Sequence, residues 1–200
     1  MHLLKRAFYY LDKEPYKRTN SGTLTVLAMA SIMVLFLPLI VTLLLARTRL
    51  HNLPFLVPHA FSLSTLIIIL SSRLLHYTRL YKDQDQYKKF RTSLIGVVML
   101  GVLFLYTQYL GWNVVHNAIH LYHIKIIIVI VALHGLHFLI AMLLFLVHFA
   151  RYSKVASPAD SYIYFLNPQK NNAFRSACLY WDYLGYLWIG LYLLMVVKTL

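Results

Sequence analysis

Five long apolar segments, separated by short polar ones, dominate the pattern of hydrophobic and polar residues. They cover residues 24–46, 53–76, 92–112, 121–149 and 177–197. A helix needs about 20 largely apolar residues to span the hydrocarbon core of a bilayer. Backbone polar groups in lipid must also form hydrogen bonds within their own segment. The pattern therefore predicts five transmembrane helices.

Composition supports the same interpretation. Hydrophobic residues make up 60% of the 200 residues and charged residues only 12%, which fits neither disorder nor an ordinary soluble domain. No fixed-period repeat is visible, and no linker is long enough to separate two domains. Cys178 is the single cysteine, so the chain cannot form an internal disulfide or a cysteine-based metal site. We expect an all-α integral membrane bundle that forms a single domain over residues 1–200.

The basic residues are distributed unevenly around these segments. Of the 19 Lys and Arg residues, five precede the first predicted helix, six surround the second connection and four lie in the fourth. The other four fall on the opposite side. The positive-inside rule then predicts a cytoplasmic N-terminus and a periplasmic C-terminus. Because topology and contact with anionic lipid explain the charge, we do not expect nucleic-acid binding.

The longest connection and the small residues suggest how the bundle is assembled. Pro158, Pro168, Asn171 and Asn172 are turn and breaker residues, and they predict a loop that is also a candidate docking surface. Small residues in the predicted helices allow close backbone packing. These small residues are Ser71, Ser72, Gly96, Gly101, Gly135, Ala141, Gly185 and Gly190.

Aromatic residues are concentrated in the fifth segment. They are Tyr180, Trp181, Tyr183, Tyr186, Trp188 and Tyr192. Tyr and Trp are enriched where a membrane protein meets the lipid headgroups. Taken one at a time, these residues are typical of an interfacial belt.

Three histidines of the fourth segment fall on one helix face. His134 and His137 lie about 60° apart, and His148 returns to within about 20° of His137. Polar side chains within a membrane helix usually point into the protein. Haem ligation would require a second axial ligand from another helix. The second segment offers only His59 and His76, about 100° out of line with each other, so a matching pair of ligands is missing.

Other chemistry finds little support in the residues. A zinc or copper site would need further ligands, and Asp182 is the only carboxylate near a predicted helix. The chain has no HExxH, GxSxG or phosphate-loop motif. The remaining interpretation is that the histidines form hydrogen bonds with neighbouring helices, lipid or a partner, each worth about 1 kcal/mol.

Several of these segments resemble subunit III of haem-copper terminal oxidases, the cytochrome c and quinol oxidases. The sequence HGLH at 134–137 resembles a signature of that family and is the most specific element. The sequence YWDYLGYLW at 180–188 is similar to its last helix, whose pattern W-H-F-x-D-x-x-W has matches at Trp181, Tyr183 and Trp188. STLIIILSS at 64–72, after the Leu-Pro-Phe entry at 53–55, and QYLGW at 108–112 also fit. The resemblance covers roughly residues 53–197 and the short five-helix form.

The chain also departs from the family pattern. Members carry carboxylates within the first two helices, whereas the corresponding segments here have none. Asp182 stands where the family has His, and Gly185 stands where it has Asp. The resemblance therefore implies roles in packing and lipid binding, while a role in proton uptake, which would use those carboxylates, stays open.

The resemblance implies an accessory subunit of a respiratory complex. Such a subunit carries no cofactor of its own and lies against catalytic subunit I, together with subunits II and IV and, beyond them, a larger respiratory supercomplex. Phospholipid is expected in a cleft between the first two and the last three helices. Haem and copper would belong to the partner subunits, and the complex would reduce oxygen and translocate protons across the bacterial inner (plasma) membrane.

Candidate residues follow from the motifs. Candidate interhelix or partner contacts are His134, Gly135, His137, Trp181 and Trp188. His59 and Arg73 are candidate contacts for lipid headgroups, because an arginine near a helix end extends to the phosphate level. Two alternatives remain open: a b-type cytochrome subunit of a quinol-oxidising or quinol-reducing enzyme, and a membrane assembly factor or small transporter.

Overall fold

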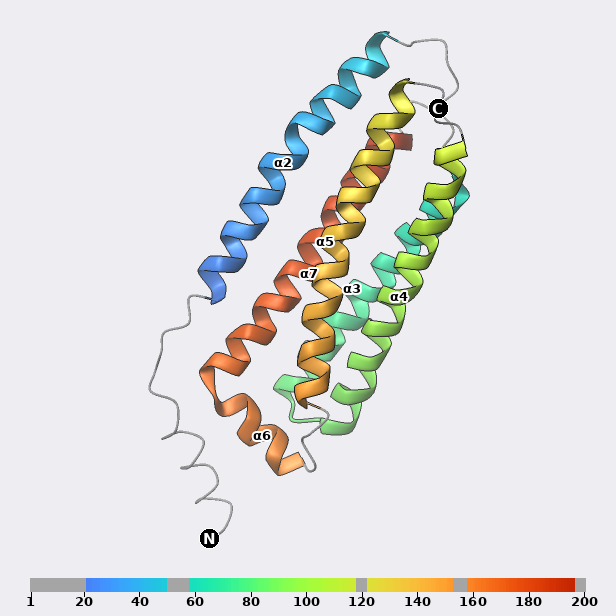
Figure 1. Cartoon of the computed structure of the whole chain (residues 1–200). Helices are drawn as coiled ribbons and strands as arrows, with labels where there is room; N and C mark the ends of the chain where they lie inside the picture. Colours follow the sequence, from blue (N-terminus) through green and yellow to red (C-terminus); the bar gives the residue numbers. More distant parts are fainter. Residues whose placement is uncertain (1–20, 50–57, 118–121, 153–157, 197–200) are drawn as a thin grey trace.

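The computed structural model describes residues 21–49, 58–117, 122–152 and 158–196, and these residues form six helices and no strand (Figure 1). The helices are α2 (Ser21–Arg49), α3 (His59–Asp83), α4 (Tyr87–Asn117), α5 (Tyr122–Tyr152), α6 (Pro158–Leu166) and α7 (Pro168–Val196). All but α6 are long and apolar enough to span a membrane. The described chain is therefore an all-helical, multi-pass membrane protein.

Most helices extend beyond the apolar segments that predict them. The helix α3 continues to Asp83 and α7 begins at Pro168, well before the expected start at residue 177. Hydropathy marks the hydrocarbon core, whereas the backbone stays helical where charged side chains reach water and headgroups. The predicted start of the second helix, at residue 53, lies outside the described residues.

The prediction of an irregular loop between the fourth and fifth segments is wrong over residues 158–176. Pro158 and Pro168 begin α6 and α7, while Asn171 and Asn172 lie inside α7. Proline is favoured at the first position of a helix, where its missing N–H would have no partner. The side-chain oxygen of Asn167 accepts hydrogen bonds from two backbone N–H groups of the first turn of α7, at 2.9 and 3.4 Å.

The helices α3 and α4 form an antiparallel hairpin with the most extensive packing in the bundle. The turn between them contains Asp85, whose φ of 54° lies in the left-handed region that Asp tolerates better than most residues. The backbone N–H of Gln86 donates to the carbonyl of Tyr81 at 2.9 Å and closes the end of α3. This turn sets the register in which the two helices meet.

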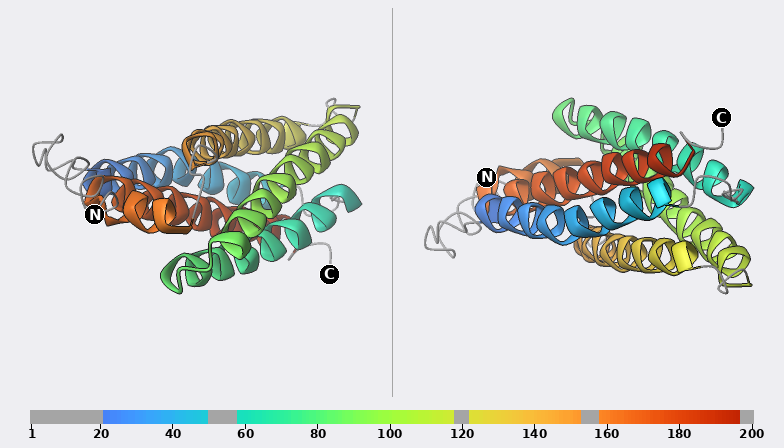
Figure 2. Two further views of the ribbon diagram at one scale, coloured as in Figure 1. Left: turned by 90° about the horizontal axis from the view of Figure 1, so that it is seen from below. Right: turned by 90° about the horizontal axis from the view of Figure 1, so that it is seen from above.

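The helix α7 is the centre of the bundle, because it packs against α2, α3, α5 and α6. The helix α2 lies at one edge of the bundle (Figure 1), and its main neighbours are α7 and α5 (Figure 2). Only Ile32, Phe36 and Leu43 of its described side chains are buried. The arrangement differs from the division into two and three helices that the resemblance implies, since α3 packs with α4 and α7.

Aromatic side chains fill the core. Trp181 and Trp188 are fully buried and Tyr180 is 7% exposed, whereas Tyr186 is 72% exposed. The interpretation as an interfacial belt is therefore wrong for Tyr180, Trp181 and Trp188, because they lie on the face of α7 that points into the bundle. The buried phenylalanines around them come from α3, α4, α5 and α7. They include Phe61, Phe90, Phe104, Phe138, Phe145 and Phe174.

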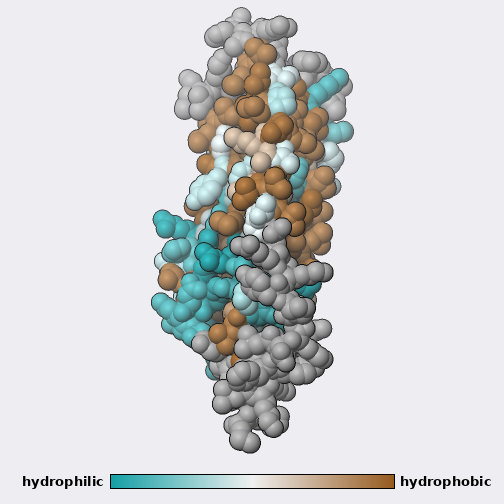
Figure 3. Space-filling view, turned by 90° about the vertical axis from the view of Figure 1, so that its left-hand side faces the viewer, coloured by the Kyte–Doolittle hydropathy of each residue, from teal (hydrophilic) through white to brown (hydrophobic). Residues whose placement is uncertain are grey.

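Polar and apolar surfaces separate along the bundle. Figure 3 shows apolar side chains over the upper part of one face and hydrophilic ones toward the lower end. In Figure 1, α3 and α5 end at that lower end, where α4 and α7 begin. The basic residues near these helix ends are Arg79, Lys82, Lys88, Lys89, Arg91, Arg151, Lys170 and Arg175. The bundle therefore has one strongly basic end.

Candidate functional site

His134 is the most enclosed of the polar candidates. Its side chain is fully buried on α5, and its Nε2–H donates to the carbonyl of Leu184 on α7 at 3.1 Å. The ring lies 5.1 Å from that of Trp188 and 5.9 Å from that of Phe104, measured between centroids. Its Nδ1 has no hydrogen-bond partner among the described residues. This histidine ties α5 to α7.

The two tryptophans tie α7 to α3. The indole N–H of Trp181 donates to the hydroxyl of Ser71 at 3.1 Å, and that of Trp188 donates to the hydroxyl of Thr65 at 3.0 Å. Thr65 in turn donates to the carbonyl of Phe61 at 2.8 Å. Each indole therefore buries a large ring and still satisfies its single donor.

The helix α4 completes this junction. Gln108 donates from Nε2 to the hydroxyl of Ser64 at 3.0 Å. Gly111 packs so closely on α3 that an added Cβ would lie 2.2 Å from the nearest ring atom of Phe61. At Gly101 an added Cβ would lie 2.6 Å from the indole of Trp181. The four segments 64–72, 108–112, 134–137 and 180–188 thus meet in one place, which we call the helix junction.

The glycines expected to allow close helix packing differ in how near a neighbouring helix lies. Gly101 and Gly185 are packing positions, because a Cβ on either would lie within 3.4 Å of a neighbouring helix. A Cβ on Gly135 or Gly190 would meet no atom within 4 Å in the part of the chain that the structure describes. The close helix approach expected at Gly135 is therefore absent there, and its face of α5 is left open.

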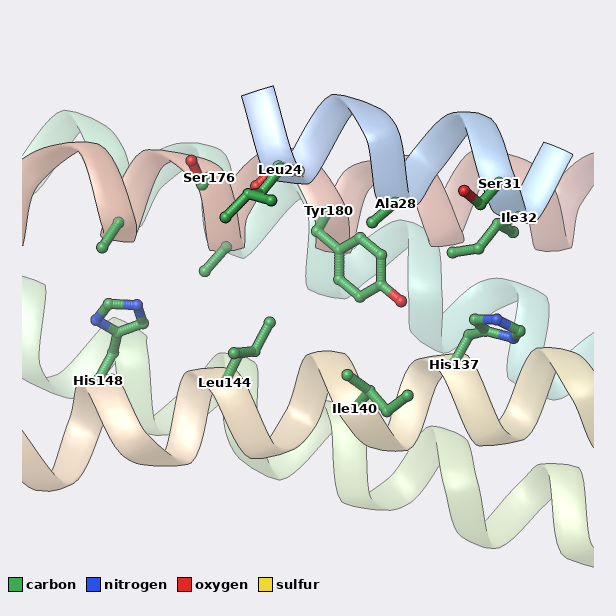
Figure 4. Close-up of a pocket in the computed structure, with 13 residues that line it drawn as sticks. Leu24, Ala28, Ser31, Ile32, His137, Ile140, Leu144, His148, Ser176 and Tyr180 are labelled. Atoms are coloured by element: carbon green, nitrogen blue, oxygen red, sulfur yellow. The ribbon is translucent and has the colours of Figure 1, made fainter. Parts of the chain in front are cut away.

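The three histidines on one face of α5 lie in two different environments: His134 lies in the helix junction, and the other two line a cavity. His137 and His148 line a cavity of about 580 Å³ between α2, α5 and α7 (Figure 4). The Nδ1–H of His137 donates to the carbonyl of Leu133 at 2.7 Å, and its ring meets Phe36 edge-on. A rotation of about 60° along α5 is enough to direct His134 into the core and His137 into the cavity.

The lining of this cavity is mostly apolar. The other lining residues are Leu24, Thr25, Ala28, Ser31, Ile32, Ile140, Leu144, Ala173, Ser176, Ala177 and Tyr180. No Lys, Arg, Asp or Glu is among the lining residues. We call this space the α2 cavity, since α2 forms one wall. It lies against the fourth and fifth membrane helices rather than between the first two and the last three.

A second cavity, of about 330 Å³, lies between α3 and α7 and has the opposite character. Arg73, His76, Arg79 and Asp182 line it. Arg79 donates from Nη2 to Asp182 at 2.5 Å, a charge-assisted contact across the two helices. Arg73 is exposed beside this pair. We call this second cavity the basic cavity.

Not every predicted residue reaches these features. His59 is exposed at the first residue of α3 and lines neither cavity. The sequence reasoning missed the ion pair between Arg79 and Asp182, although the single carboxylate near a predicted helix pointed to it. It also missed Tyr180 as a cavity residue, because its pattern matched the interfacial belt.

The described residues contain no group of three or more His, Cys, Asp or Glu side chains placed to hold a metal ion. The chain matches no model of a known protein family and no curated protein. The physical features of the junction and the two cavities therefore carry the functional inference.

Proposed function

We propose that this chain is an accessory, cofactor-free subunit III of a respiratory haem-copper oxidase. It would stabilise the catalytic subunit and hold phospholipid while the complex reduces oxygen to water and moves protons across a bacterial inner membrane. The observation that carries the proposal is the helix junction. The four segments that resemble subunit III lie apart in the sequence and are joined in this region by four hydrogen bonds between helices.

The helix junction holds neighbouring helices together. His134, Trp181 and Trp188 each use a ring nitrogen to bond another helix. Hydrogen bonds between membrane helices contribute on the order of 1 kcal/mol each, and aromatic packing adds to this. Donors and acceptors on four helices also fix the rotation of each helix about its axis. Such a rigid scaffold suits a subunit that supports a catalytic partner.

The outer surface supports a role in assembly and lipid binding. One face of α5 exposes a continuous apolar strip that is available to a partner subunit or to lipid. Its members are Leu136, Leu139, Ile140, Leu143, Leu146 and Val147. In the basic cavity, Arg73 and Arg79 lie in the half of α3 nearer its basic end. Basic pockets between membrane helices suit anionic phospholipid headgroups.

The basic end also supports the orientation. Helix ends that carry Lys and Arg usually face the cytoplasm. With the ends of α3 and α5 on that side, the N-terminus would be cytoplasmic and the C-terminus periplasmic. The bacterial inner membrane is the membrane in which such a respiratory complex works.

Co-purification tests the proposal. The full chain, tagged and extracted in mild detergent, should retain the haem-copper catalytic subunit, identified by mass spectrometry and by the haem spectrum of the complex. The variant Trp181→Phe, which removes the indole donor of the junction, should lower that retention, while Tyr106→Phe, on the exposed face of α4 and outside both cavities, should leave it unchanged. Isolation of the chain without any oxidase subunit would overturn the proposal in favour of an assembly factor or transporter.

A spectrum of the isolated chain tests the cytochrome alternative. An accessory subunit should show no Soret band once it is separated from its partners. A stoichiometric haem signal that remains with the chain would make it a b-type cytochrome and would refute the accessory role.

A further inference from the structure

The α2 cavity contains a tyrosine whose hydroxyl group has no partner. Tyr180 is only 7% exposed, and its hydroxyl has no hydrogen-bond partner within the described ranges of the chain. In Figure 4 this hydroxyl points along the cavity toward His137. The hydroxyl opens into the cavity, where a hydrogen bond to a ligand would contribute about 1 kcal/mol.

His137 offers the complementary group. Its Nδ1 must carry a proton, because the carbonyl of Leu133 can only accept a hydrogen bond. In the neutral ring Nε2 is then an acceptor, and it has no partner among the described residues. The cavity therefore presents a donor from Tyr180 and an acceptor from His137. A single ligand hydroxyl group can satisfy both.

The hydrogen-bonding groups of this pair limit the ligand. His137 lies near the middle of its predicted apolar segment, 121–149, whereas Tyr180 lies three residues inside the start of the segment 177–197, about 4.5 Å along the helix. The pair therefore lies in the apolar part of the bundle, on the side of its basic end. Acyl chains carry no hydrogen-bonding group, and the ester oxygens of a phospholipid can only accept, so they would leave Nε2 of His137 unpaired. Since no charged side chain lines the cavity, a free fatty acid would find no cation there.

The length and volume of the cavity fit an elongated apolar ligand. His137 and His148, at its two ends, are separated by about 16 Å along α5. The volume of about 580 Å³ is within the range typical of small-molecule sites. The apolar side chains of Ile140 and Leu144 lie between the two histidines on α5.

We propose that the α2 cavity binds an isoprenoid quinol, with one ring hydroxyl between Tyr180 and His137 and the tail along α5. That hydroxyl donates to Nε2 of His137 and accepts from the hydroxyl of Tyr180. A quinone oxygen can only accept, so it would leave Nε2 unpaired. The cavity therefore prefers the reduced ligand. This site does not depend on the role as subunit III, because it uses neither the helix junction nor the basic cavity.

Binding to the full chain in nanodiscs of zwitterionic phospholipid tests the site. The probe is a radiolabelled benzoquinol with a decyl tail, kept reduced under anaerobic conditions, and its oxidised form serves as comparison. We expect saturable binding, with the quinol bound about five-fold more tightly than the quinone, the value of one hydrogen bond. Tyr180→Phe should weaken quinol binding by about the same factor, and Tyr186→Phe should not.

A second pair of variants tests the location without touching the polar groups. Ala28 lines the cavity on α2, while Ala30 is exposed on the same helix and does not line it. Ala28→Phe should fill the cavity and weaken quinol binding more than ten-fold, whereas Ala30→Phe should bind like the parent chain. Equal binding by the members of either pair, equal affinity for quinone and quinol, or occupation by phospholipid that the quinol does not displace would each overturn the assignment.

Discussion

Gly111 offers the sharpest test of how tightly the helix junction is packed. An alanine Cβ at this position would lie 2.2 and 2.5 Å from two ring atoms of Phe61. Phe61 is fully buried and its ring meets Trp188 edge-on at 5.5 Å, so it has little room to move. Overpacking of this kind costs about 1–3 kcal/mol. Gly111→Ala should therefore separate α3 from α4 at the junction and destabilise the bundle.

A matched variant isolates the steric effect. Replacing glycine by alanine also favours a helix by about 1 kcal/mol, so the change at Gly111 combines two opposing effects. Gly190→Ala has only the favourable effect on helix propensity, because its Cβ would meet no atom within 4 Å among the described residues. We expect the free energies of unfolding of the two variants to differ by about 1–3 kcal/mol.

Reversible unfolding in mixed micelles, with increasing dodecyl sulfate and tryptophan emission as the signal, measures this difference. Trp181 and Trp188 are buried in the junction and report on its opening. Unfolding free energies of the two variants within about 0.5 kcal/mol of each other would contradict the close contact between Gly111 and Phe61, since substitutions at exposed positions usually change stability by no more than that.

Three further predictions use the same unfolding measurement or limited proteolysis. Trp181→Phe should lower the unfolding free energy by about 1 kcal/mol for the lost donor to Ser71, plus the cost of the space that the smaller ring leaves, and Ser71→Ala added to it should lower it little further. Asp182→Asn should destabilise by about 1–2 kcal/mol, because the partly buried Arg79 loses its ionic partner on α7, and Arg79→Met combined with it should recover part of that loss. Tyr183→Phe removes a 2.9 Å hydrogen bond to α2 and should speed proteolysis of α2 without changing the rest of the bundle; an unchanged rate would contradict the contact.

The approximate positions of the membrane helices are predictable from the sequence, while their ends are not. Apolar segments are detected because the hydrocarbon core excludes charge, and each predicted segment overlaps one of the long helices. The helix ends fall in the headgroup region, where hydropathy no longer reports on the backbone. The start of α7 shows this best, since Pro168 and the polar first turn look like a break in the chain and are a capped helix start.

The sequence identifies the candidate residues by residue type and position, but their roles depend on the side chains that surround them in the folded bundle. A polar stripe on one face of α5 is visible in the sequence, because the helical period is fixed. Whether His134 and His137 share an environment depends on which helices pack on either side of that face. Tyr180 and Trp181 are adjacent aromatic residues that sequence reasoning treats alike, yet one lines the α2 cavity and the other fills the core.

By itself, then, the sequence determined that the chain has five segments long and apolar enough to span a membrane as helices, with the basic residues gathered toward one end. Burial of apolar side chains in lipid and satisfaction of backbone hydrogen bonds are local requirements, so each segment meets them alone. Only the tertiary structure decided that α7 is central, that α2 lies at the edge beside a cavity, and that four distant segments form one junction. Those features depend on the rotation and contact of helices distant in sequence, which local pattern does not encode.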